Sequence, residues 1–247
     1  MNSFAPDTVF YAIGDVHGEA ARLRALHEQI LDHHEQTFPE RPITIIHLGD
    51  YVDRGPDSKG VIDAIMALEA RVASRPELTV LSLRGNHEQM MLDALDGDLD
   101  QLDLWLRNGG RETLRSYTGP DGDIDAAMAD LPKRHIEWLS ALPTIFRIPQ
   151  HHLIFVHAGI EPRDYPNCNA QRHLWTRSPR FFDPVQWAGN EALSGMCVVH
   201  GHTPTVGFMP EVAGDTQRIN VDTGAVYGGQ LTAVVIADNA KPEFLTN

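Results

Sequence analysis

Three short motifs within the first 88 residues combine glycine with side chains that bind metal ions. They occupy residues 14–18 (GDVHG), 49–55 (GDYVDRG) and 85–88 (GNHE). Carboxylate and amide oxygens and imidazole nitrogens bind divalent cations, and glycine lets the backbone turn sharply beside an ion. Two later motifs, residues 157–159 (HAG) and 200–203 (HGHT), again place histidine after an apolar run. The pattern predicts a site for two metal ions at one edge of a β-sheet.

Four side chains of the first three motifs are candidate metal ligands. Asp15 and His17 lie two residues apart in a predicted tight turn, so both can reach one ion. Asp50 offers a carboxylate after the next predicted strand, and its two oxygens can bridge two ions. Asn86 supplies a neutral amide oxygen, which suits a hard cation and is a poor choice for a buried core. A capping aspartate beside a chance histidine would explain the first motif alone, but three motifs in register argue against it.

The residues beside these candidates could bind phosphate and carry protons. Arg54 has a planar guanidinium that matches phosphate oxygens, and Asp53 precedes it directly. His87 follows Asn86 on a predicted sharp turn, so one side chain can face a metal while the other faces a substrate. A surface Asp–Arg pair and a structural histidine are the alternatives, and the combination of motifs argues against both.

The later histidines offer further nitrogen ligands. His157 ends the predicted strand 153–156, whereas His200 and His202 flank Gly201 after an apolar run. We expect these two side chains to point to opposite faces, so that only one need be a ligand. We predict that the remaining histidines, including the pairs 33–34 and 151–152, lie on the surface.

Strands followed by helices must position the first three motifs. Apolar runs predict strands at 9–13, 43–48 and 78–83, and a helical pattern follows each of them, with Ser58 as the predicted N-cap of the second helix. The motifs begin 35 and 36 residues apart, a natural spacing for βα units. Parallel strands joined by helices have their C-terminal ends on one side of the sheet, where ligands bind.

The rest of the chain predicts a helical segment and a second sheet. Aspartates scattered among apolar residues over about 96–142 indicate an insertion of helices with solvated acidic faces and a loop at 119–122. Later apolar runs predict closely spaced strands at 144–148, 153–156, 196–199, 218–221 and 231–237. A long irregular stretch covers 162–192. We therefore predict an α/β fold in a single domain, 1–247, with two packed mixed β-sheets flanked by helices.

Composition excludes several classes of protein. The 247 residues are 42% hydrophobic and 22% charged, and the formal net charge of -14 argues against nucleic acids or anionic lipid as partners. The sequence has neither a predicted membrane span nor a signal segment, so we expect a cytoplasmic protein. Cys168 and Cys197 are predicted to be buried thiols, with a bridge between them left open.

The motif set GDVHG, GDYVDRG, LRGNHE, HAG and GHT resembles the phosphoprotein phosphatase family of calcineurin-like metallophosphoesterases. The compact bacterial and phage-lambda-type serine/threonine phosphatases are the most similar branch. The motifs extend from residue 14 to 203, and residues 222–225 (DTGA) resemble the C-terminal strand of the family. The resemblance implies the four-layer sandwich of this family.

The resemblance also implies roles for individual residues. The implied metal ligands form two sets that share a bridging carboxylate: Asp15, His17 and Asp50 for one ion, and Asp50, Asn86, His157 and His202 for the other. His87 would be the general acid, oriented by Asp53. Arg54 and Arg177 would bind phosphate, with Arg163, Arg172 and Arg180 as competitors for the second arginine position.

The implied activity is hydrolysis of a phosphomonoester, most simply as a protein serine/threonine phosphatase. The implied cofactors are two divalent metal ions with a hydroxide that bridges them. Manganese is the expected metal, and iron and zinc are the alternatives. The substrate would be a phosphorylated protein or a small phosphoester.

One alternative function is that of a symmetrical diadenosine tetraphosphate hydrolase. Those enzymes, however, generally lack aspartate at the position of Asp53 and have aspartate at the position of Glu88. The other is a phosphoprotein-binding module without catalysis. Oligomeric state is not readable from the sequence.

Overall fold

The computed structural model describes residues 4–119, 122–238 and 240–247, and its strands form two five-stranded sheets. The first sheet has the order β10–β9–β1–β2–β3, with β1 (Val9–Ile13), β2 (Ile43–His47), β3 (Leu78–Ser82), β9 (Thr232–Ile236) and β10 (Glu243–Thr246). The second has the order β4–β5–β6–β8–β7, with β4 (Ile145–Ile148), β5 (Leu153–Val156), β6 (Cys197–His200), β7 (Glu211–Ala213) and β8 (Arg218–Asn220). Both sheets are mixed: β1–β2–β3 and β5–β6–β8 are parallel, and their outer strands pair antiparallel.

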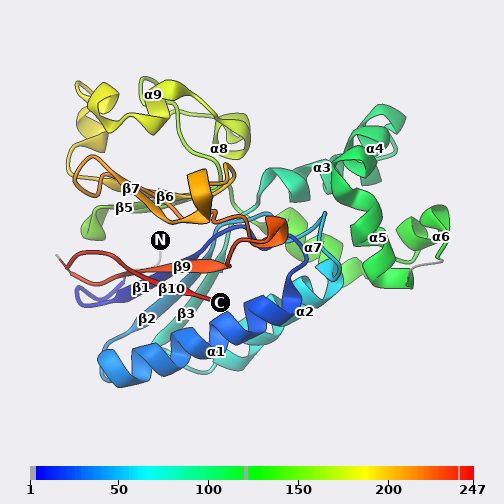
Figure 1. Cartoon of the computed structure of the whole chain (residues 1–247), viewed down its shortest axis with the longest axis horizontal. Coiled ribbons are helices and arrows are strands. Elements are labelled where there is room, and N and C mark those ends of the chain that lie inside the picture. The colour runs from blue at the N-terminus through cyan, green and yellow to red at the C-terminus, as the bar shows by residue number, and fades with distance from the viewer. Residues whose placement is uncertain (1–3, 120–121, 239) are drawn as a thin grey trace.

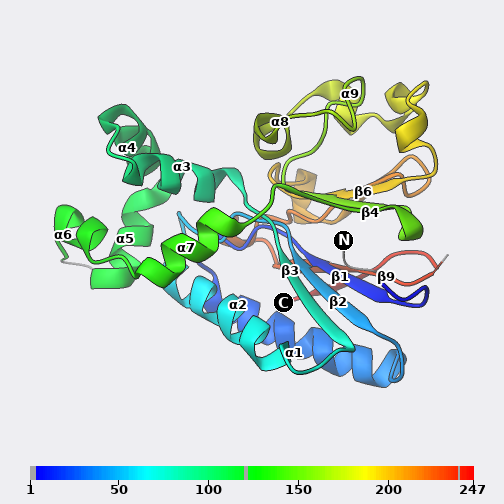
Figure 2. The same ribbon diagram turned by 180° about the vertical axis from the view of Figure 1, so that it is seen from behind.

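Helices cover the outer face of each sheet, so the sandwich has four layers (Figures 1 and 2). The described helices are α1 (Ala20–Thr37), α2 (Ser58–Val72), α3 (Asn86–Leu95), α4 (Leu99–Trp105), α5 (Arg111–Thr118), α6 (Ile124–Ala129), α7 (Lys133–Ala141), α8 (Ala170–Trp175) and α9 (Pro179–Phe182). Helices α1 and α2 lie on the first sheet, and the segment with α8 and α9 lies over the second. The predicted α/β fold, with two packed mixed sheets flanked by helices, is confirmed.

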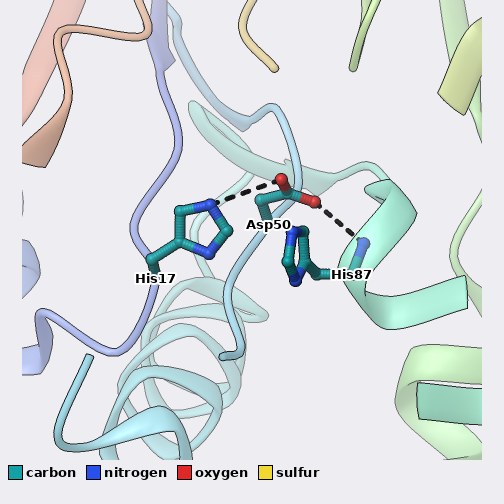
Figure 3. A group of neighbouring side chains, drawn as sticks. All are labelled: His17, Asp50 and His87. Carbon is teal, nitrogen blue, oxygen red and sulfur yellow. Dashed lines mark hydrogen bonds and ion pairs between the residues drawn. The ribbon is translucent and has the colours of Figure 1, made fainter. Parts of the chain in front are cut away.

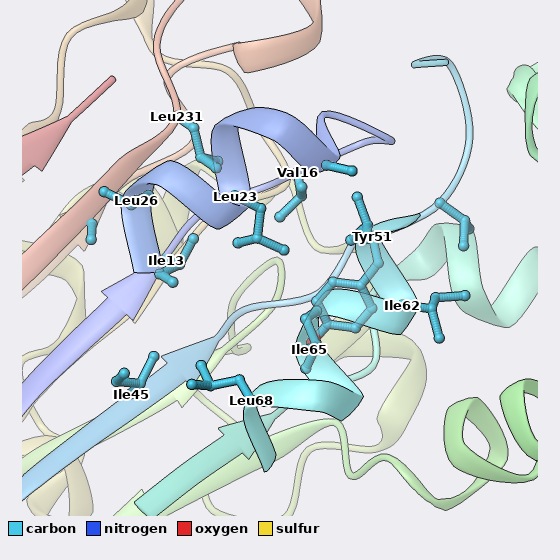
Figure 4. Close-up of a cluster of buried hydrophobic side chains, with 14 of the residues drawn as sticks. Ile13, Val16, Leu23, Leu26, Ile45, Tyr51, Ile62, Ile65, Leu68 and Leu231 are labelled. Atoms are coloured by element: carbon cyan, nitrogen blue, oxygen red, sulfur yellow. The ribbon is translucent and has the colours of Figure 1, made fainter. Parts of the chain in front are cut away.

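The two faces of β1 show how the sequence builds this core. All five residues of the strand are buried, and successive side chains point to opposite faces of the sheet. Ile13 packs with Leu23 of α1 and Ile62 of α2 in a helix-facing cluster (Figure 4). Tyr11 belongs to the same cluster. Phe10, in contrast, packs between the two sheets with residues of β5, β6 and β8. A continuous apolar run is therefore required, because both faces of the strand are covered.

Three details differ from the predictions. The N-cap of α2 is Asp57, whose side chain accepts the N–H of Gly60, and not Ser58, which is the first helical residue. Strands β7 and β10 were not predicted, because both are short edge strands with polar residues. Five of the histidines predicted to lie on the surface are buried instead, because they lie in strand β2 or on the inner faces of helices: His27, His34, His47, His135 and His173. The predicted loop 119–122 lies partly outside the described residues.

The segment predicted as a helical insertion, 96–142, contains α4 to α7. These helices project to one side of the sandwich next to α3 (Figures 1 and 2). A π-helical turn, Leu106–Gly110, joins α4 to α5 and breaks at Gly109, where φ is 109°. The segment 162–192 contains α8, α9 and two short 3₁₀ turns, Pro184–Trp187 and Glu191–Leu193.

Cys168 and Cys197 are free thiols, both half-buried, so the bridge that the sequence left open does not form. Within the described ranges, no helix is both long enough and apolar enough to cross a membrane.

Candidate functional site

The candidate residues gather where the parallel strands of both sheets end. Two groups of three buried residues could each hold a metal ion, because the ligand atoms within each group lie within 4.8 Å of one another. The first group is His17, Asp50 and His87, and the second is Asp50, His157 and His202. The loops after β1 and β2 and the first turn of α3 supply the first group, and the loops after β5 and β6 complete the second. Asp50 belongs to both groups, which is the place that a bridging carboxylate requires.

The first group is organised around the Asp50 carboxylate (Figure 3). His17 Nε2 lies 3.5 Å from Asp50 Oδ2, and the backbone N–H of His87 donates to Asp50 Oδ1 at 3.1 Å. His17 Nδ1 lies 2.8 Å from the carbonyl oxygen of Val52, and Arg54 Nη1 donates to its Nε2 at 2.6 Å. Burial lowers the pKa of His17 to about 3. The ring is therefore neutral, with Nδ1 protonated and the lone pair of Nε2 facing the site.

The second group repeats this arrangement. His157 Nδ1 lies 3.0 Å from the carbonyl oxygen of Leu48, and its Nε2 lies 2.9 Å from Asn86 Oδ1 and 3.3 Å from Asp50 Oδ1. His202 Nδ1 lies 2.8 Å from the same Asn86 oxygen. Burial lowers the pKa of His157, although the Asp50 charge opposes this effect. A histidine that donates one ring nitrogen to a backbone carbonyl presents the other as a fixed ligand.

Asp15 lies beside these groups but belongs to neither. Both of its carboxylate oxygens accept the backbone N–H of His202, at 3.0 and 3.1 Å. Burial, together with the carboxylates of Asp222 and Asp50, raises the pKa of Asp15 well above its usual value. The site thus concentrates carboxylates that repel one another, and positive charge placed among them would relieve this repulsion.

These residues fit a pair of divalent cations. The site offers a shared carboxylate, an amide oxygen that two histidine nitrogens approach, neutral imidazoles with oriented lone pairs, and a local excess of negative charge. Imidazole together with carboxylate suits manganese, iron or zinc better than calcium.

Asp53 and His87 form a buried pair next to the first group. His87 Nδ1 lies 2.7 Å from Asp53 Oδ2. Burial lowers the pKa of His87, but Asp50 and Asp53 outweigh this effect and raise it overall. Burial raises the pKa of Asp53, against hydrogen bonds from His87, Thr113 and Trp105 that favour the carboxylate. The pair holds a proton on His87 Nδ1 and fixes the direction of the opposite ring nitrogen.

The two arginines predicted to bind phosphate both reach candidate ligands. Arg54 contacts His17, as described, and its guanidinium lies over the Tyr227 ring at 5.7 Å. Arg177 Nε donates to His202 Nε2 at 3.2 Å. Of the competing arginines, Arg180 pairs with Glu161 at 3.6 Å. Arg177 therefore has a direct geometric link to the candidate centre.

The site loops adopt strained backbone conformations. His17, Asp50, Asp53, Arg54 and His202 all have positive φ, between 43° and 74°. Non-glycine residues rarely occupy this region, and those that do cluster at functional sites. These backbone conformations form the tight turns from which the side chains point toward the candidate site.

Glu88 holds two of these loops together and was not predicted to do so. Its carboxylate accepts the backbone N–H groups of Asp50, Tyr51, Val52 and Gly85 at distances of 2.7–3.2 Å. Burial and the nearby Asp50 raise the pKa of Glu88 to about 7, whereas these N–H donors favour the ionised form. The sequence could have indicated this role, because Glu88 lies three residues after Gly85, which is the spacing of a capping box at the start of a helix.

The expectation that His200 and His202 point to opposite faces of a strand was wrong in its premise, because residues two apart in a strand lie on the same face. Strand β6 ends at His200, and His202 lies beyond it in a left-handed turn with φ of 67°. His200 is fully buried, with its Nε2 3.0 Å from Arg218 Nη1 and its ring against Phe181. Alternation within a strand therefore does not separate the two histidines. The turn between them does.

Comparisons with known proteins agree with this geometry. The sequence model of the family described as calcineurin-like phosphoesterase matches residues 8–230. The chain belongs to this family. As a calcineurin-like phosphoesterase, it is a hydrolase whose family depends on divalent metal ions.

Relatives within the family have different named activities. The chain is 30% identical to serine/threonine-protein phosphatase 1 of Salmonella typhimurium over 231 residues, which cover 90% of this chain and 89% of that protein. It is 26% identical to the asymmetrical bis(5'-nucleosyl)-tetraphosphatase PrpE of a Geobacillus species over 234 residues, covering 90% and 87%. A solved cold-active protein-tyrosine phosphatase of a Shewanella species shares the fold, with a TM-score of 0.63, 18% identity and coverage of 98% and 83%.

Proposed function

We propose that this phosphoesterase is a phosphomonoester hydrolase that acts on phosphorylated serine or threonine residues of proteins. The observation that carries the proposal is the buried His87–Asp53 pair beside two ligand groups that share Asp50. The Salmonella relative, which is named a serine/threonine-protein phosphatase and aligns over 90% of this chain, supports a protein substrate.

The proposed metal ligands are the two sets that share Asp50: Asp15, His17 and Asp50 for one ion, and Asp50, Asn86, His157 and His202 for the other. Manganese is the proposed metal, with iron or zinc as alternatives. When bound, the ions would supply positive charge to the phosphate oxygens and lower the pKa of a coordinated water molecule.

The residues of the chain then have separate tasks. Arg54 and Arg177 would bind phosphate oxygens and orient the substrate, because a guanidinium donates several hydrogen bonds in one plane. The Asp53 carboxylate accepts a hydrogen bond from His87 Nδ1–H and keeps the ring fixed. His87 would donate its Nε2 proton to the oxygen of the departing alcohol, which would otherwise leave as a strongly basic alkoxide.

A second candidate function is hydrolysis of bis(5'-nucleosyl) tetraphosphates. It is favoured by the Geobacillus relative, whose name states that activity and which aligns over 90% of this chain. Hydrolysis of a phosphoanhydride releases a phosphate that is a weaker base than an alkoxide. Such a reaction depends less on the Asp53–His87 pair.

The first experiment measures hydrolysis of p-nitrophenyl phosphate with added manganese and then with chelator. We expect activity that the chelator abolishes, and a fall of roughly 100-fold or more in kcat for His87→Asn on a phosphoserine peptide. His152→Asn is the matched control, because His152 is an exposed histidine outside the candidate site. Turnover by Asp50→Asn at the wild-type rate would contradict the proposed centre.

The second experiment compares a phosphoserine peptide, a phosphothreonine peptide, a phosphotyrosine peptide and diadenosine tetraphosphate at equal concentration. The proposal requires the highest kcat/KM on the serine or threonine peptides. A clear preference for the dinucleotide would establish the second candidate instead. Binding of a phosphopeptide without turnover would identify a non-catalytic module.

A further inference from the structure

Two residues of the segment 96–142 reach the Asp53 carboxylate from outside the motif loops. Trp105, the last residue of α4, donates its Nε1–H to Asp53 Oδ1 and Oδ2 at 2.9 and 3.1 Å. Thr113, near the start of α5, donates its hydroxyl to Asp53 Oδ1 at 2.7 Å. Both side chains are fully buried. Neither residue belongs to the motifs that the sequence pattern singled out.

The backbone between them is shaped for this approach. The carbonyl oxygen of Gly109, in the π-helical turn, accepts the N–H of Arg54 at 3.3 Å. A Cβ on Gly109 would lie 2.6 Å from that nitrogen, and a Cβ on Gly110 would lie 2.6 Å from the Trp105 ring. Glycine is therefore required at both positions for the turn to lie against the Asp53–Arg54 loop.

Trp105 and Thr113 complete a set of hydrogen bonds that fixes the orientation of the Asp53 carboxylate. One oxygen of the carboxylate accepts from His87 and Trp105, and the other from Trp105 and Thr113. The Thr113 hydroxyl also accepts the backbone N–H of Asp53, at 2.8 Å. With His87 alone, the carboxylate could rotate about its Cβ–Cγ bond. Three donors from three segments fix its plane and hence the direction of the His87 ring.

We propose that Trp105 and Thr113 are positioning residues through which the helical segment holds Asp53 against His87. The inference rests on the proposed function, because it assigns the His87 proton to the departing alcohol. It makes the segment 96–142 part of the reaction, although neither residue touches the substrate. The expected signature is a defect that grows with the basicity of the leaving group.

The test compares phenyl phosphate with p-nitrophenyl phosphate in wild type, Thr113→Val, Thr113→Ser and Trp105→Phe. The two esters have nearly the same shape, but nitrophenolate is a much weaker base and needs little help from an acid. We expect kcat on phenyl phosphate to fall about tenfold in Thr113→Val and Trp105→Phe, with a fall of less than about twofold on the nitrophenyl ester. Thr113→Ser, which retains the hydroxyl, should keep the wild-type ratio.

The ratio of the two kcat values is independent of the fraction of folded protein, so a partly unfolded variant still gives an answer. Trp187→Phe is the matched control, because its buried indole donates to the carbonyl oxygens of Arg180 and Phe181 at a distant place. It should keep the wild-type ratio. An unchanged ratio in both Thr113→Val and Trp105→Phe would overturn the inference while leaving the proposed function intact.

A second measurement does not require turnover. The proton on His87 Nδ1 should give a downfield NMR signal, which is assigned by its loss in His87→Gln. We expect Thr113→Val to shift or broaden the signal and Thr113→Ser to leave it in place. If the wild type hydrolyses neither ester with manganese, the proposed function fails, and an unshifted signal in Thr113→Val would overturn the positioning role separately.

Discussion

Replacing Glu88 by glutamine tests how the site loops are held in their strained conformations. One carboxylate oxygen accepts the N–H groups of Asp50 and Gly85, and the other accepts those of Tyr51 and Val52. Glutamine has the same shape, but its NH₂ group cannot accept a hydrogen bond. Whichever way the amide is turned, two buried N–H groups lose their partner.

The magnitude follows from these two donors. A buried donor without a partner costs about 1–3 kcal/mol, so we expect Glu88→Gln to lower the free energy of unfolding by about 2–6 kcal/mol. This is a large share of the roughly 5–15 kcal/mol that stabilises a typical domain. Urea unfolding followed by circular dichroism measures it. The protein is kept in chelator so that bound ions add no stability.

Glu137→Gln is the control for the loss of a carboxylate. Glu137 is exposed and pairs with Lys133 at 3.2 Å, so its replacement should change the free energy of unfolding by less than about 1 kcal/mol. If Glu88→Gln lowers the free energy of unfolding no more than Glu137→Gln does, then the four N–H bonds to Glu88 do not hold the loops.

Two further predictions concern stability. Burial lowers the pKa of His27 from 6.5 to about 4, so the unfolded chain binds the extra proton between these values. The free energy of unfolding should therefore fall by about 3 kcal/mol as the pH drops from about 6.5 to about 4. Urea titrations should show a smaller decrease over this pH range in His27→Gln. Gly109→Ala should destabilise more than Gly97→Ala, since both have positive φ (109° and 91°) but only the first Cβ meets backbone, at Arg54. Equal losses in unfolding experiments would contradict the close approach.

The elements that carry the motifs could be predicted because their apolar runs are continuous. Strands β1 and β2 are buried on both faces, and each run stops at a glycine motif, so the strand end and the candidate ligand coincide in the sequence. The same reasoning places Asp50 just after β2 and His157 just after β5, although these strands belong to different sheets.

The missed features depend on contacts between distant segments. Trp105 and Thr113 reach Asp53 from 52 and 60 residues away in the chain, and nothing local distinguishes them from core residues. Ser58 is suited to be an N-cap, but its hydroxyl instead accepts the N–H of Asp53, which leaves the cap to Asp57. Edge strands such as β10 gain their pairing from a neighbour and carry little periodicity of their own.

The left-handed residues of the site have a consequence for attempts to engineer this protein. At His17, Asp50, Asp53, Arg54 and His202 the backbone is in a region that glycine occupies without strain. For an ordinary side chain the same conformation costs of order 1–3 kcal/mol. Selection for thermal resistance alone would therefore favour glycine at the very positions proposed for chemistry. A more stable protein obtained in this way would keep the two-sheet fold but lose the side chains proposed for metal binding and catalysis.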